Sequence, residues 1–294
     1  MAGKINNAFE LSQQSWNALL QNKQLIMFPV ISMIGMIIVT VLFIIPEAFL
    51  VWPIIRATDT NSDASLIQWV VALVVLFIYY LAAYFVVIFS NTALVGATMK
   101  IIRGEPATVS DGIAIARTRL GKILVYALIS ATVGVLAKVI TSSGRRSKNF
   151  LVMLFTAIIG GLIQGAWELA VFFAIPIIVA EDVNILDSLK RSLALFKQTW
   201  GESVLGSVAV GGISCLAYLA VILITGAIML AGMLLELLPL TILGFILLIF
   251  GFVLVSVLNG AVNGIFQASL YNYAVTGNAG PFIDTNMARE AFSA

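Results

Sequence analysis

Long apolar runs without a charged residue are the feature that most limits how this chain can fold. The run from Leu25 to Pro46 contains no charged side chain, and neither does the run from Leu66 to Met99. About 20 predominantly apolar residues are enough for a helix to cross a hydrocarbon core of about 30 Å. Charged residues make up only 10% of the chain, against about 25% in an ordinary soluble domain. The sequence therefore predicts an integral membrane protein.

Six long apolar runs, each with at most two charged residues, predict six transmembrane spans, and we expect each span to be helical. Backbone groups in lipid must be hydrogen-bonded internally, and the runs lack the ten-residue alternation of barrel strands. The expected spans are 26–52, 66–99, 120–141, 150–180, 203–236 and 240–275. Lys122 and Lys138 leave the third span short, so a tilted or re-entrant segment is its alternative. The predicted fold class is all-α, a polytopic transmembrane helix bundle that forms a single domain over residues 1–294.

The distribution of lysine and arginine predicts the orientation of the spans. With both termini in the cytoplasm, eleven of the sixteen basic residues lie on the cytoplasmic side. Short cytoplasmic loops are enriched in these residues, although the basic loop at 141–149 goes against the rule. We therefore expect a multi-pass protein of the cell (cytoplasmic) membrane with cytoplasmic termini.

Several classes of function are disfavoured by residues that the chain lacks. It has no histidine, which is the commonest general base and metal ligand. One cysteine, Cys215, allows neither a disulfide nor a thiolate cluster within the chain, and no phosphate-binding loop, nucleophile elbow or zinc-protease motif is present. A net charge of +2 without a basic tail argues against nucleic acid. We expect no enzyme activity, catalytic residue, cofactor or metal; an intramembrane enzyme would depend on carboxylates alone.

Two polar stretches resemble each other at the expected starts of helices. G-E-P-A-T-V-S-D-G-I aligns with A-E-D-V-N-I-L-D-S-L, with their acidic residues at the same spacing. Thr108 is followed three residues later by Asp111, and Asn184 by Asp187, which is close to the pattern of a helix capping box. Each stretch therefore predicts the start of a helix.

A second similarity extends this pattern over the whole chain. L-S-Q-Q-S-W-N near the N-terminus resembles L-F-K-Q-T-W-G, and a span follows each of them. We interpret the chain as three units of an interfacial amphipathic helix followed by a transmembrane hairpin. The units are 1–103, 104–179 and 180–280, followed by a short polar tail at 281–294. Chance similarity between amphipathic helices that precede spans is the alternative.

The chain also resembles a widespread group of uncharacterised prokaryotic six-span membrane proteins. The resemblance is carried by F-E-L-S-Q-Q-S-W-N-A-L-L-Q-N-K-Q-L-I-M-F-P, Y-A-L-I-S-A-T-V-G, F-F-A-I-P-I-I-V-A-E-D and L-K-R-S-L-A-L-F-K-Q-T-W-G-E. The last segment is similar to one in a broader superfamily, which includes YciC-like inner-membrane proteins and the membrane domain of glycerophosphodiester phosphodiesterases. This resemblance implies a fold and a location, and it implies no catalytic residue, because the phosphodiesterase chemistry belongs to a separate soluble domain.

Polar residues inside the spans are candidates for function. Glu168 lies near the middle of the fourth span with Gln164 one turn earlier, and a charge there costs about 2.5–3.5 kcal/mol on insertion scales. Asn259, Asn263 and Gln267 form a polar stripe at four-residue spacing in the sixth span. Either set could form a proton, cation or solute path, or hydrogen-bond across packed helices, and we favour packing.

Basic residues beside the amphipathic helices are candidate contacts for lipid headgroups. Cations near a membrane surface attract anionic headgroups by about 1 kcal/mol each. The candidates are Arg117, Arg119, Lys122, Lys190, Arg191 and Lys197. We therefore expect a non-enzymatic membrane scaffold that contacts lipid, a protein partner or a second copy of itself. A small-solute or ion transporter or channel is the alternative.

Overall fold

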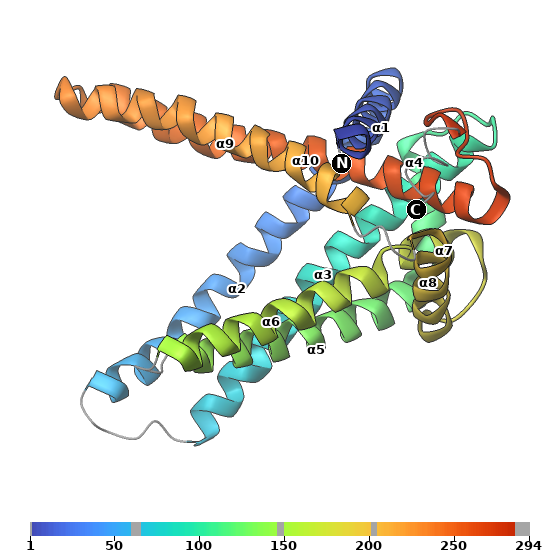
Figure 1. Ribbon diagram of the computed structural model, residues 1–294. Coiled ribbons are helices and arrows are strands. Elements are labelled where there is room, and N and C mark those ends of the chain that lie inside the picture. The colour runs from blue at the N-terminus through green and yellow to red at the C-terminus, as the bar shows by residue number, and fades with distance from the viewer. Residues whose placement is uncertain (1, 60–65, 146–149, 201–204, 286–294) are drawn as a thin grey trace. The chain divides into compact units, whose positions relative to one another are not determined.

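The computed structural model describes residues 2–59, 66–145, 150–200 and 205–285, and within these ranges it contains helices and no strand. The elements are α1 Ala2–Gln21, η1 Lys23–Ile26, α2 Met27–Asp59, α3 Leu66–Ile102, α4 Val109–Thr118, α5 Leu120–Arg145, α6 Phe150–Val171, α7 Ala174–Ala180, α8 Ile185–Trp200, α9 Leu205–Leu234 and α10 Leu238–Thr276 (Figure 1). The predicted all-α fold class is confirmed.

Six helical segments of the described residues are long and apolar enough to cross a membrane. They are Lys23–Phe49, Leu66–Ile102, Leu120–Ser142, Leu151–Ala180, Cys215–Leu234 and Leu238–Thr276. These segments agree with the six predicted spans to within a few residues, and α9, the helix that contains the fifth, begins at Leu205. The third is one uninterrupted helix, without the break that a re-entrant segment needs.

The order of the elements follows the predicted pattern of a short helix before two long ones. Helices α1, α4 and α8 each precede a pair of long helices, and the third is the most strongly amphipathic of them. The boundaries of the three repeat units, and the single domain over the whole chain, stay predictions.

The chain divides into two compact units, which are described separately. The first comprises Met1–Val30, Ala97–Val109 and Leu195–Ala294. In it, α9 packs along α10 as an antiparallel hairpin (Figure 1), and α1 packs against both helices. Close approach within the hairpin requires glycine, because a Cβ at Gly232 would lie 2.6 Å from the backbone nitrogen of Thr241.

The turn between α9 and α10 is a Schellman motif. The Leu237 N–H donates to the Gly232 carbonyl at 2.8 Å, and the Glu236 N–H donates to the Met233 carbonyl at 3.3 Å. Such a motif places its C′ residue in the left-handed region, and Glu236 has a φ of 55°. Glu236 therefore occupies a position at which glycine is usual.

The second unit comprises Ile31–Gly96 and Ser110–Ala194. Helices α5 and α6 lie side by side in it (Figure 1), and the rings of Phe43 on α2 and Tyr79 on α3 meet edge to face. Its fully buried side chains are mostly aliphatic. They include Leu94, Ile123, Ala127, Phe173, Ile177 and Ile178.

The fourth span differs from the continuous helix that the sequence predicts. It is interrupted between Val171, where α6 ends, and Ala174, where α7 begins. Pro176 explains the break, because proline has no N–H and its ring clashes with the carbonyl of the residue four positions earlier, here Phe172. The Phe173 N–H at the break donates to Ser192 Oγ on α8 at 2.9 Å.

Candidate functional site

The start of α8 is held by the cap that the sequence predicts. Asn184 Oδ1 accepts a hydrogen bond from the Asp187 N–H at 2.9 Å, and Asn184 Nδ2 donates to Asp187 Oδ2 at 2.6 Å. The first bond satisfies one of the N–H groups that a helix start leaves without an internal partner. The cap fixes where the α7–α8 connection ends, and with it the position of Asp182.

Asp182 brings together two of the predicted basic residues. Arg119 Nη1 and Lys122 Nζ each lie 2.6 Å from Asp182 Oδ1. Arg119 precedes α5 directly and Lys122 is in its first turn, so one carboxylate links the start of α5 to the α7–α8 connection. The hydrogen bond from Lys122 and the positive charges of Lys122 and Arg119 lower the pKa of Asp182 below its usual range.

Two further predicted cations on α8 also lie near carboxylates. Lys190 Nζ is 3.8 Å from Asp187 Oδ1, and Arg191 Nε is 3.6 Å from Glu181 Oε1. The remaining two predicted cations, Arg117 and Lys197, are exposed. Four of the six predicted headgroup contacts therefore lie in a cluster of mixed charge rather than in a purely basic patch.

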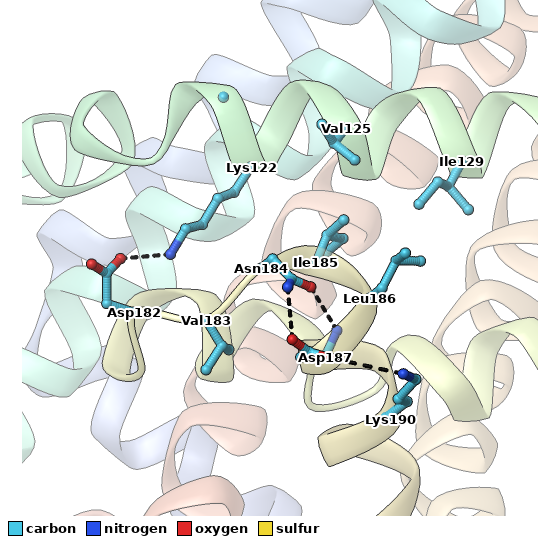
Figure 2. A pocket seen from close by; sticks show the side chains of 11 residues that line it. Lys122, Val125, Ile129, Asp182, Val183, Asn184, Ile185, Leu186, Asp187 and Lys190 are labelled. Carbon is cyan, nitrogen blue, oxygen red and sulfur yellow. Dashed lines mark hydrogen bonds and ion pairs between the residues drawn. The ribbon is translucent and has the colours of Figure 1, made fainter.

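A pocket with a volume of about 910 Å³ opens between the start of α5 and the start of α8. Its charged lining consists of Lys122, Asp182, Asp187 and Lys190. Val125 and Ile129 continue down α5 from Lys122 and face the side where Ile185 and Leu186 lie (Figure 2). The pocket therefore has a charged rim and an apolar wall, and we refer to it as the α5–α8 pocket.

The candidate pair inside the fourth span is in contact along its own helix. Gln164 Nε2 donates to Glu168 Oε1 at 3.1 Å, and Glu168 is exposed. A Cβ added at Gly161 or Gly165, on the turns around Gln164, would meet no heavy atom within 4 Å. Within the described residues of α6's own unit, no other helix therefore lies against either glycine at this distance.

The polar stripe of the sixth span belongs to the other unit. Asn263 Nδ2 donates to Asn259 Oδ1 at 3.1 Å, and Gln267 follows one turn later, partly exposed. The proposed path would need this stripe and Glu168 together, and the two are placed in units that are described separately. Their convergence stays a prediction.

Sequence reasoning missed the role of the acidic residues in the charged cluster. Glu181 and Asp182 are not among the predicted headgroup contacts, which are all basic, and within the described residues no group of three or more His, Cys, Asp or Glu is placed to hold a metal ion. The sequence did hold a signal for this role. Both acidic residues come directly after the fourth span, and the basic residues at the start of α5 are expected on the same side of the membrane.

The helical fold of the described residues and the six long apolar spans define a multi-pass membrane protein. The chain belongs to DUF6159, a family of unknown function whose model matches residues 70–282. The matched segment includes α5, α7, α8 and the α5–α8 pocket. No curated protein matches the chain.

Proposed function

We propose that this protein is a non-enzymatic membrane protein that holds lipid headgroups at the membrane surface through the α5–α8 pocket, and so serves as a scaffold in the lipid layer. The α5–α8 side is the cytoplasmic side in this proposal, in keeping with the basic residues of the short loops. The resemblance to YciC-like proteins and to the phosphodiesterase membrane domain supports a role that needs no catalytic residue in the spans.

The observation that carries this proposal is the position of the pocket's charged rim. The span in α5 begins at Leu120, and the span that includes α7 ends at Ala180, so Lys122 and Asp182 lie where two neighbouring spans leave the hydrocarbon. Lipid headgroups occupy this level of a bilayer. A lipid at the pocket would meet charge at its headgroup and the apolar wall of α5 along its chain.

The apolar wall follows from helical spacing. Val125 and Ile129 are three and seven residues after Lys122, so all three lie on one face of α5. Val125 is 43% exposed and Leu186 across the pocket is 60% exposed, which leaves apolar surface for an acyl chain. This surface distinguishes the pocket from a solvated cluster of charges.

The experiment fills the pocket and leaves its charges in place. Gly121 lines the pocket, and a Cβ built there meets no heavy atom within 4 Å, so Gly121→Trp introduces a large ring without a backbone clash. Gly226 in α9 is equally open and lies outside the pocket, which makes Gly226→Trp the matched control. Lipids retained by the purified protein are counted by native mass spectrometry after stepwise delipidation.

We expect the unmodified protein and Gly226→Trp to keep a tightly held lipid that Gly121→Trp loses. Equal lipid retention by all three proteins would overturn the proposed lipid-holding role. The scaffold role could also take the form of a protein contact at the same surface. A protein partner that competes with the lipid would bind the unmodified protein and would not bind Gly121→Trp.

Transport through the spans is the second candidate function. It is favoured by the contact of Gln164 with Glu168 inside an otherwise uncharged span, since intramembrane carboxylates often belong to ion or proton paths. Proteoliposome flux assays with Glu168→Gln test it. A flux that the substitution abolishes would favour transport, and no flux above protein-free liposomes would contradict it.

A further inference from the structure

The charges that line the α5–α8 pocket balance one another. Two lysines, Lys122 and Lys190, face two aspartates, Asp182 and Asp187. An anionic headgroup would be attracted by the lysines and repelled by the aspartates. A group that carries one positive and one negative charge would be attracted by both kinds of side chain.

The hydrogen bonds of Asp182 leave one of its oxygens available. Both of its basic neighbours contact Oδ1, and the side chain is 79% exposed. Among the described residues no hydrogen bond ends on Oδ2 of Asp182. A carboxylate oxygen in this position accepts a hydrogen bond from a primary ammonium group, whereas a quaternary ammonium has no hydrogen to donate.

We propose that the α5–α8 pocket selects a zwitterionic phospholipid with a primary ammonium, of the phosphoethanolamine class. The ammonium donates to Asp182, the lipid phosphate contacts the neighbouring Lys122, and the first part of an acyl chain lies along Val125 and Ile129. This inference rests on the proposed lipid-holding function and names the lipid class that the pocket takes. It also replaces the purely anionic preference that the basic residues alone predict.

The apolar wall favours a lipid over a soluble zwitterionic molecule as the ligand of the pocket. A soluble molecule such as glycerophosphoethanolamine would leave Val125, Ile129 and Leu186 without a contact. A chain of the lipid would cover them, and burial of apolar surface contributes about 25 cal/mol per Å². The headgroup analogue therefore serves as a probe for the source of the binding.

The test measures headgroup selectivity in the full-length protein. Delipidated protein in detergent is titrated with phosphatidylethanolamine, phosphatidylglycerol and phosphatidylcholine that carry identical acyl chains, and binding is followed by native mass spectrometry. We expect phosphatidylethanolamine to bind about tenfold more tightly than the other two, the size expected of one charge-assisted hydrogen bond. Glycerophosphoethanolamine at equal concentration should not displace it.

Two variants test whether the headgroup selectivity arises from the pocket. Asp182→Asn removes the negative charge that attracts the ammonium and frees Lys122 and Arg119, so phosphatidylethanolamine should bind more weakly and phosphatidylglycerol more tightly. Lys138→Gln removes an exposed cation further along α5 and outside the pocket, and it should leave the ratio of the two affinities unchanged.

Each contrary outcome overturns a stated part of the inference. Phosphatidylglycerol binding as tightly as phosphatidylethanolamine would overturn zwitterion selectivity, and equal binding of phosphatidylcholine would overturn the need for a primary ammonium; the lipid-holding function would stand in both cases. Displacement by glycerophosphoethanolamine would overturn the assignment to a lipid. No lipid bound above the level of Gly121→Trp would overturn the function and the inference together.

Discussion

The Phe173 N–H donates a hydrogen bond to Ser192 Oγ at 2.9 Å, and both residues are fully buried. Phe173 lies at the break between α6 and α7. Ser192 is two turns into α8. This one bond therefore joins the interfacial helix to the interrupted span, and it supports the position of the α7–α8 connection.

Replacing Ser192 with alanine should destabilise the protein. A buried donor that loses its acceptor costs about 1–3 kcal/mol in the free energy of unfolding. Ser188 is the matched control, because its buried hydroxyl donates to the Ile185 carbonyl in its own helix, so Ser188→Ala leaves no N–H without an acceptor. Unfolding in detergent with a denaturant series measures both; equal free energies for the two variants would contradict the role given to Ser192.

The ion pairs of Asp182 predict a dependence of stability on pH. The pKa of Asp182 is lowered in the folded protein, and a carboxyl of this kind stabilises the fold above its unfolded pKa. That contribution is lost as the pH falls through the lower, folded pKa.

The difference between the unmodified protein and Asp182→Asn isolates this one carboxyl from the others. We expect the variant to unfold at lower temperature near pH 7, and the two melting temperatures to converge below about pH 4, near the usual pKa of aspartate. Melting temperatures that still differ at the acid end by as much as at neutral pH would show that the substitution acts through something other than charge.

Local spacing explains the parts of the site that could be predicted from the sequence. Asn184 and Asp187 are three residues apart, and Gln164 and Glu168 are four apart. Residues at these separations are neighbours on any helix, so their contacts follow once the helix is assigned. The spans follow from the uncharged runs for a similar reason, since each is decided by a continuous stretch of sequence.

The charged cluster could not be predicted in this way, because its members are far apart in the sequence. The contact of Lys122 with Asp182 depends on how α5 packs beside α6 and α7. The pattern of apolar and polar residues within each segment does not predict how the helices pack against each other. The same holds for the hydrogen bond between Phe173 and Ser192.

The buried face of α8 also differs from its apolar stripe. Sequence periodicity places Leu189 and Leu193 on one face with Ile185, yet Leu193 is 47% exposed while Ser188 and Ser192 are fully buried. Lipid is as apolar as leucine, so small and polar residues often mark the protein-facing side of a membrane helix. Hydrophobicity alone therefore indicates that α8 is amphipathic without indicating which face meets the protein.

The close approach of α9 and α10 predicts opposite effects for two glycines of one helix. A Cβ at Gly232 would lie 2.6 Å from the Thr241 backbone nitrogen, whereas a Cβ at Gly226 meets nothing within 4 Å. We expect Gly232→Ala to cost about 1–3 kcal/mol through overpacking and Gly226→Ala to gain about 0.5–1 kcal/mol through helix propensity. Free energies of unfolding measured in the same detergent compare them, and a neutral Gly232→Ala would mean that the hairpin separates at little cost.

The left-handed residue in the α9–α10 turn predicts a stabilising substitution. Glu236 has a φ of 55° at the C′ position of the Schellman motif, and this conformation costs an L-residue about 1–2 kcal/mol. Glycine avoids that cost. It also gives the unfolded chain more conformational freedom, which offsets about 0.4–1 kcal/mol of the gain. Glu236→Gly should therefore raise the free energy of unfolding by about 0.5–1 kcal/mol. Glu236→Ala removes the same carboxylate but keeps the Cβ, and it should show no such gain. If alanine stabilised the protein as much as glycine, the loss of the exposed charge rather than relief of the backbone would be the cause.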